Sequence, residues 1–187
     1  MPGKSKTPRR AQGTAHPQPI QPLLKRLPRA HRMMESGQHA DAGQIFLDLG
    51  RKTEDRGMLR TAPYLYLQAG WAHLLGGQIQ EGSEWLQYGL SILQTSARWG
   101  TLERVSLHVC MQLEQLGYPE LASSIDNWTR QALPYSIESQ PVLPSLRGRL
   151  PLRCPVCQGV LKPELIELLD EGRAGCPYCG SWLILSD

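Results

Sequence analysis

The sequence predicts a mainly α-helical protein, in which a short array of helical hairpins is followed by a small β-rich module. Two observations predict the array: glycines recur at a step of 40 residues, at Gly37, Gly77 and Gly117, and other small residues recur in the same register. A third observation predicts the module, because two Cys-Pro-x-Cys pairs stand in the last 34 residues. A chain of 187 residues has room for one medium domain or two small ones.

The beginning of the chain differs from the rest in charge and in proline content. Residues 1–34 carry eight basic side chains and no acidic one, whereas the other 153 residues carry twelve basic and seventeen acidic ones. Residues 1–22 also contain frequent prolines and little to bury, so we expect a disordered basic tail. A solvated tail, a weak non-specific contact of residues 1–34 with nucleic acid or an anionic surface, and an organelle transit peptide remain open.

Three columns of small residues define the repeat, which we place in residues 23–133. A small residue stands five positions after each repeating glycine, and another stands seven positions before it. The columns are Gly37, Gly77 and Gly117; Ala42, Gly82 and Ala122; and Ala30, Gly70 and Cys110. This spacing predicts that a first helix ends at each glycine in a left-handed cap, and that a second helix packs back against it at the small residues.

Two further expectations follow from this register. In the middle hairpin, apolar and small residues at helical spacing predict a second helix from Ile79 to Gln94. Cys110 lies in a small-residue column, so we expect a buried residue rather than a reactive thiol. His108 does not activate it, because residues two apart on a helix do not face each other.

These columns resemble the tetratricopeptide repeat family, whose pattern has a small residue in the first helix, a glycine before the turn and an alanine early in the second helix. Gly70, Gly77 and Gly82 match the pattern most fully, with Tyr66 at the family's first aromatic position. The resemblance covers about residues 24–133, although the family's period is near 34 residues. HEAT-like hairpins share the length of about 40 residues but lack the glycine and alanine columns.

The resemblance implies a concave face, lined by the first helices, that holds a peptide or a partner helix. Candidate contact residues on that face recur at the step of 40, and two others lie one turn earlier. They are His31, Trp71 and Met111, with Gln68 and His108. Core packing or a solvated face is the alternative for each. Trp71 is the strongest candidate, because tryptophan is over-represented among the residues that dominate binding energy.

Residues 134–153 connect the array to the module. Prolines recur every few residues between Pro134 and Pro151, together with three arginines. Such prolines prevent a helix and stiffen the chain, so we expect a spacer.

Four cysteines in residues 154–187 have the spacing of a metal site. They are Cys154, Cys157, Cys176 and Cys179. Two residues between thiolates allow one tight turn to direct both sulfurs at a single ion, and we expect Gly159 and Gly180 to take the positive φ needed beside them. The spacing predicts a structural Zn²⁺ held by four thiolates in a zinc ribbon. A redox dithiol and disulfides are the alternatives.

Short strands are expected after each cysteine pair, at Gly159–Leu161 and Ser181–Leu185. Residues 163–170 fit either one or two helical turns or a strand. A ribbon of about 34 residues is too small to bury a sufficient core by itself, so the metal is expected to supply much of its folding free energy.

The sequence predicts binding rather than catalysis. Four thiolate ligands leave no open position on the metal, and no metalloprotease, phosphate-loop or nucleophile-elbow motif is present, so we expect no enzyme. A thiolate site fits a reducing compartment, and no apolar run approaches the ~20 residues of a membrane span, so we expect a cytoplasmic protein.

We therefore expect an adaptor that binds a protein or peptide partner through the helical array. The alternative is a nucleic-acid-associated zinc-ribbon protein that uses its basic tail. Residues 154–187 weigh against it, because they carry two basic side chains against five acidic ones, and a surface that binds phosphates should be basic.

Overall fold

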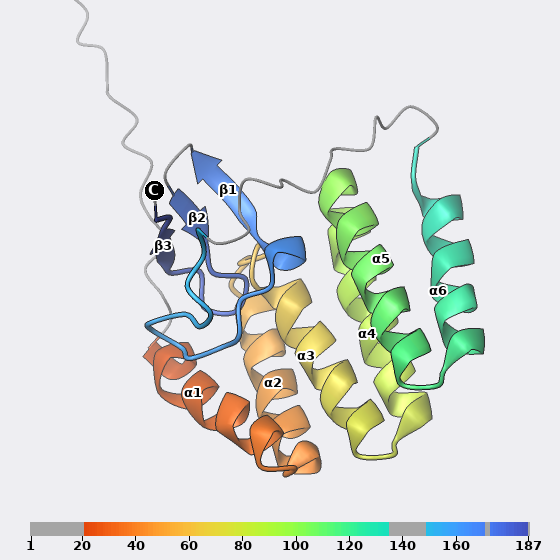
Figure 1. Ribbon diagram of the computed structural model, residues 1–187, viewed down its shortest axis with the longest axis horizontal. Coiled ribbons are helices and arrows are strands. Elements are labelled where there is room, and N and C mark those ends of the chain that lie inside the picture. Colours follow the sequence, from red (N-terminus) through yellow and green to blue (C-terminus); the bar gives the residue numbers. More distant parts are fainter. Residues whose placement is uncertain (1–20, 135–148, 171–172, 187) are drawn as a thin grey trace, which may run out of the picture.

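The computed structural model describes residues 21–134, 149–170 and 173–186. Within them, six helices are followed by a three-stranded antiparallel sheet (Figure 1), so the predicted fold class is confirmed. The expected tail, residues 1–22, lies almost wholly outside the described residues, as does most of the expected spacer. Among the described helices, none combines the length and the apolar character needed to cross a bilayer.

The helices form three antiparallel hairpins. These are α1 (Gln21–Glu35) with α2 (His39–Glu54), α3 (Ala62–Leu75) with α4 (Ile79–Thr95), and α5 (Trp99–Gln115) with α6 (Pro119–Ala132). The second helix expected from Ile79 to Gln94 therefore ends one residue later than predicted. We call α1, α3 and α5 the first helices.

Each hairpin turns at a glycine of the 40-residue step. Gly37, Gly77 and Gly117 have φ values of 77°, 81° and 84°, in the left-handed region predicted for them. The residue after each glycine donates its N–H to the carbonyl five positions back, as Gln78 does to His73 at 2.8 Å. This bond satisfies a carbonyl that the end of the helix would otherwise leave unpaired.

The connections between hairpins use the same left-handed turn. Gly57 after α2 and Ala97 after α4 have φ values of 69° and 54°, and Arg98 donates its N–H to Leu93 at 3.0 Å. A turn of this kind therefore occurs every 20 residues from Gly37 to Gly117. Ala97 is the one position of this series without a glycine.

In the second and third hairpins the small-residue columns meet, as predicted. A Cβ added to Gly70 would lie 2.9 Å from the carbonyl oxygen of Gly82, and one added to Gly82 would lie 2.9 Å from that of Gly70. In the third hairpin, the Cys110 thiol donates to the carbonyl of Ala122 at 3.3 Å. Cys110 is buried, and burial raises the pKa of its thiol to about 11, so it is an unreactive packing residue.

The remaining described residues, 149–170 and 173–186, form the C-terminal part of the fold, which we call the cysteine module. Its elements are the 3₁₀ turn η2 (Pro163–Leu165) and the strands β1 (Glu167–Asp170), β2 (Arg173–Gly175) and β3 (Trp182–Ile184), in the sheet order β1-β2-β3. Residues 163–170 thus divide between a helical turn and a strand. The strand expected at Gly159–Leu161 is reduced to an isolated bridge between Val160 and Arg153.

The core of the array continues into the cysteine module. The four cysteines belong to the same buried apolar cluster as Phe46 of α2 and Leu65 of α3. In Figure 1 the module lies against the array beside α1 and α3. The two parts therefore pack together as one body over this region.

Gly82→Ala is expected to destabilise the array by about 1–3 kcal/mol, because the methyl group has no room between α3 and α4. This loss should appear although alanine is the better helix former. The midpoint of urea unfolding, followed by circular dichroism, measures it. Gly175→Ala in β2 is the control, since a Cβ there meets nothing within 4 Å. An unchanged midpoint for Gly82→Ala would contradict the close approach of the two helices.

Ala97→Gly is expected to stabilise the protein by about 1 kcal/mol, because glycine adopts a left-handed conformation without the steric cost that a Cβ brings. Ala40→Gly, at an exposed right-handed position in α2, should lower stability instead. Calorimetric unfolding of both variants tests the pair. An equal loss of stability in the Ala97→Gly and Ala40→Gly variants would show that the backbone at Ala97 is not strained.

Candidate metal centre

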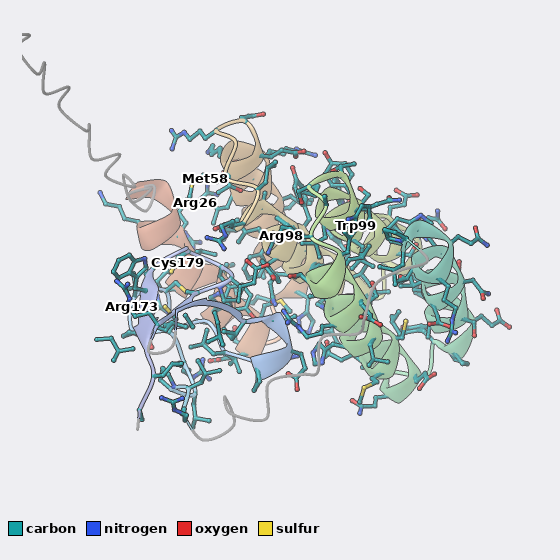
Figure 2. All side chains as sticks on the ribbon, turned by 90° about the horizontal axis from the view of Figure 1, so that it is seen from above. Arg26, Met58, Arg98, Trp99, Arg173 and Cys179 are labelled. Atoms are coloured by element: carbon teal, nitrogen blue, oxygen red, sulfur yellow. The ribbon has the colours of Figure 1, made fainter. Side chains whose placement is uncertain are left out.

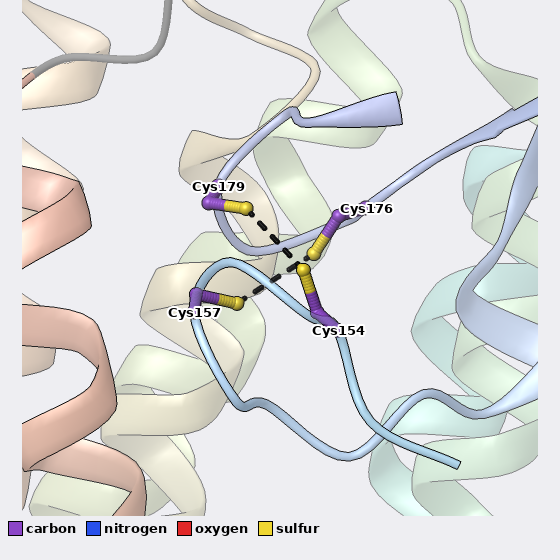
Figure 3. Close-up of side chains that lie close together, drawn as sticks. All are labelled: Cys154, Cys157, Cys176 and Cys179. Atoms are coloured by element: carbon purple, nitrogen blue, oxygen red, sulfur yellow. Dashed lines mark hydrogen bonds between the residues drawn. The ribbon is translucent and has the colours of Figure 1, made fainter. Parts of the chain in front are cut away.

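The four predicted cysteine ligands converge at one point of the cysteine module (Figure 3). All four are buried, and their sulfur atoms lie within 4.8 Å of one another. The sulfurs of Cys154 and Cys179 are 3.8 Å apart, and so are those of Cys157 and Cys176. Four sulfurs held about 2.3 Å from a central ion in a tetrahedron would be separated by about 3.8 Å. These distances are compatible with a four-coordinate metal site.

The alternatives left open by the sequence fit this geometry less well. All five cysteines are free, and a separation of 3.8 Å far exceeds the ~2.05 Å of a disulfide bond. The described sheet is antiparallel throughout, so the module lacks the βαβ unit that accompanies a thioredoxin-like dithiol. A metal site is the arrangement that uses all four sulfurs.

Two matching turns present the cysteines. Gln158 donates its N–H to the carbonyl of Cys154, and Gly180 donates its N–H to the carbonyl of Cys176, both at 2.9 Å. The N–H of the leading cysteine in each pair also donates to the carbonyl five residues further on, again at 2.9 Å. The same hydrogen-bond pattern in both halves aims each pair of sulfurs at the common centre.

The backbone of the first turn corrects one expectation. Gly180 takes a positive φ of 72° as predicted, but in the first turn the left-handed residue is Gln158, at 63°, and not Gly159. Gly159 is needed for space instead. A Cβ there would lie 2.6 Å from the ring of Tyr178 and 2.7 Å from Nε2 of His31. Glycine thus allows this turn to press against α1.

The four thiols strongly shift the pKa values of one another. Hydrogen bonding with Cys157 lowers the pKa of Cys154, whereas hydrogen bonding with Cys154 raises the pKa of Cys176. The Ser181 hydroxyl lies 3.0 Å from the sulfur of Cys179. Four thiolates this close would repel one another, and a bound divalent cation is the charge that lets all four ionise.

The cysteine module covers part of the face on which the sequence placed the partner contacts. Tyr178 packs edge-on against the His31 ring, with centroids 5.1 Å apart, and its hydroxyl accepts a hydrogen bond from Gln68 at 3.4 Å. Lys162 donates to Nε2 of His108 at 3.3 Å. His31, Gln68 and His108 therefore contact the chain's own C-terminal part.

A cavity of about 320 Å³ lies where the first helices meet the cysteine module. Trp71, His31 and Gln68 line it, together with the C-terminal ends of the first helices and part of the module. Met111 is exposed and is not one of the lining residues. The structure thus brings three of the five candidate contact residues to one cavity and leaves Met111 and His108 outside its wall.

Glu167 of β1 makes the main polar contact between module and array. Arg98, at the start of α5 (Figure 2), donates from Nε to the Glu167 carboxylate at 2.9 Å, and the Thr101 hydroxyl donates to it at 2.8 Å. Arg60 lies 3.5 Å from the other carboxylate oxygen. Burial raises the pKa of Glu167, but the charge of Arg98 and these hydrogen bonds outweigh burial and hold the pKa below its usual range. Sequence reasoning missed this contact, because Arg98 and Glu167 are 69 residues apart and belong to no motif.

In comparisons with known proteins, no protein-family model, no curated protein and no solved structure matched this chain. The structure shows six packed helices and a C-terminal cysteine cluster that could bind a metal.

Cys176→Ser is expected to abolish metal binding, because it removes one of four converging ligands. Elemental analysis by mass spectrometry should find about one ion per wild-type chain and none in the variant. Cys110→Ser is the matched control and should keep the ion, since Cys110 packs between α5 and α6. Equal metal content in the two variants, or a wild-type chain without metal, would contradict the site.

Proposed function

We propose that this protein is a non-enzymatic adaptor that binds a protein partner through its helical array. The observation that carries the proposal is the cavity between the first helices and the cysteine module, with Trp71 in its wall. Cavities of roughly 300–1,000 Å³ at the junction of two structural parts are the usual place for binding. Tryptophan in such a position is typical of residues that contribute most to affinity.

We further propose that the cysteine module is a zinc ribbon with a structural Zn²⁺. Four sulfur ligands in a tetrahedron are typical of zinc, with iron as the competing metal. An ion held by four thiolates has no open position for water or substrate, which supports a structural rather than a catalytic role. Thiolate ligands persist under reducing conditions, so we place the protein in the cytoplasm.

The helical array supports a tetratricopeptide-like arrangement. The left-handed glycine turns and the contact of Gly70 with Gly82 are what the sequence pattern of that family requires. The cavity wall adds chemistry suited to a peptide, because both apolar side chains and carboxamides line the cavity together with Trp71. These residues are Met34, Leu75 and Leu116, with Gln68, Gln112 and Gln115. An apolar partner side chain would pack on Trp71, while the amides bond to the partner's backbone.

The alternative is a nucleic-acid-associated protein that uses its basic tail. Exposed Lys25, Arg29 and Arg32 on α1 extend the basic character of the tail into the described structure. Such charges would give a salt-sensitive attraction without sequence specificity. In the module, by contrast, Lys162 is engaged with His108, so it adds little to such a surface.

Trp71→Ala is expected to weaken partner binding by roughly 30-fold or more, the loss typical of a central tryptophan. The partner is first identified by affinity capture and mass spectrometry, and the dissociation constant is then measured by calorimetry. Trp128→Ala on α6 is the matched control, because Trp128 does not line the cavity. Deleting residues 1–20 should leave capture intact, and the deletion stops there because α1 begins at Gln21.

The same deletion variant separates the two proposals. If it binds a labelled oligonucleotide tightly at moderate salt, the nucleic-acid alternative displaces the adaptor. If oligonucleotide binding is lost with the tail while partner capture remains, the adaptor stands.

A further inference from the structure

We propose that the cysteine module is a reversible cover of the face formed by the first helices. Loss of the metal, or of the Glu167 contact, would uncover α1, α3 and α5 while the helices remain folded. The inference rests on the proposed function only in assigning a metal to the four cysteines. It adds that the face of the first helices has a closed and an open form.

Much of the contact between this face and the module is polar, beside the apolar packing of Tyr178 and the four cysteines. The array side chains that hydrogen-bond to the module include Gln68, Arg98, Thr101, Arg104 and His108, and Glu35 and Arg60 form ion pairs with it. Such groups regain hydrogen bonds to water when the module leaves, so uncovering them leaves no unsatisfied donor. Polar interfaces within a chain resemble transient protein–protein interfaces, for which relative motion of the two parts is expected.

The hairpins are held together by contacts between their own helices and do not depend on the module. Close backbone contacts such as that between Gly70 and Gly82, and fully buried residues such as Leu86 and Leu90, hold them together. The module, by contrast, has strands of only three or four residues around its four cysteines. Its fold therefore depends on the metal, and removing the ion should release the module while the hairpins keep the contacts between their own helices.

Two buried histidines distinguish opening of the module from unfolding of the array. His31 and His73 are 8% and 1% exposed, and in both the Nε2 atom is buried without a hydrogen-bond partner. Nε2 of His31 lies under Gly159 of the module, 2.7 Å from where a Cβ would be, whereas Nε2 of His73 lies 3.1 Å from the corresponding point of Gly43 on α2. Opening the module exposes His31 alone, and unfolding the array exposes both.

The experiment measures the modification of each histidine by diethyl pyrocarbonate in the full chain at neutral pH, resolved by mass spectrometry. Burial lowers the pKa of His31 to about 4 while the module covers it. Once exposed, a histidine has an ordinary pKa of about 6.5, so most of the ring is still neutral and reactive at neutral pH. After a chelator removes the metal, His31 should react roughly tenfold faster or more, while His73 stays protected and the helical circular dichroism is kept.

A second arm opens the module with the metal in place. Glu167→Lys sets a cation opposite Arg98 and Arg60. Breaking this partly buried ion pair should also raise the rate of His31 modification by roughly tenfold or more. Glu120→Lys, an exposed position in the first turn of α6, makes the same charge change away from the module and should leave the rate unaltered.

Protection of His31 in either arm would overturn the inference. So would a parallel rise at His31 and His73, which would make the module an integral part of the array's core. A chain that binds no metal would disprove the proposed zinc ribbon, yet the Glu167→Lys arm would still decide whether the module opens. Partner binding is not part of the readout, so a failure of the adaptor proposal leaves this test intact.

Discussion

The placement of Tyr178 connects the two halves of this structure. The residue lies between Cys176 and Cys179, so the turn that presents two sulfurs also presents its ring to α1. Its hydroxyl donates to the carbonyl of Val160 at 3.0 Å and accepts from Gln68, which joins both cysteine turns to α3. A side chain held in this way cannot shift without moving the sulfurs. Metal geometry and the packing of the module on the array are therefore parts of one arrangement.

The array depends on a different constraint, the left-handed turn that ends each helix. Because such turns recur at Gly37, Gly57, Gly77, Ala97 and Gly117, the chain reverses direction every 20 residues. The reversal places the first helices in parallel and brings small residues of paired helices into contact. Helix length, turn geometry and the small-residue columns therefore agree with one another, which is the property expected of a sequence that specifies a single fold.

Local sequence patterns were sufficient to predict much of this fold. The left-handed caps, the contact of Gly70 with Gly82 and the convergence of the cysteines all follow from short spacings whose geometry is fixed by the backbone. The assignment of positive φ to Gly159 was wrong. A glycine can be required either because the backbone has a positive φ or because a neighbouring group leaves no room for a Cβ. At Gly159 the second reason holds, and only the position of the His31 ring shows it. One-dimensional patterns do not contain that information.

The position of the module on the array could not be predicted for a related reason. It depends on contacts between residues far apart in the chain, such as Arg98 with Glu167 and His108 with Lys162. Each of these residues, considered alone, has the properties of an ordinary solvated charge or a core histidine. The sequence did place candidate contacts on the first helices, but it could not show that the chain's own C-terminal part would reach them.

The span of the module also sets a length for the array. It contacts His31 on α1 at one end and Thr101 on α5 at the other, with α3 between them. An additional hairpin inserted inside this span would carry α5 away from β1 and separate the two anchoring points. Whole repeats could be gained only outside this span, where they leave the contacts of the module with α1 and α5 unchanged. The contacts of the C-terminal part with α1 and α5 therefore fit an array of three hairpins.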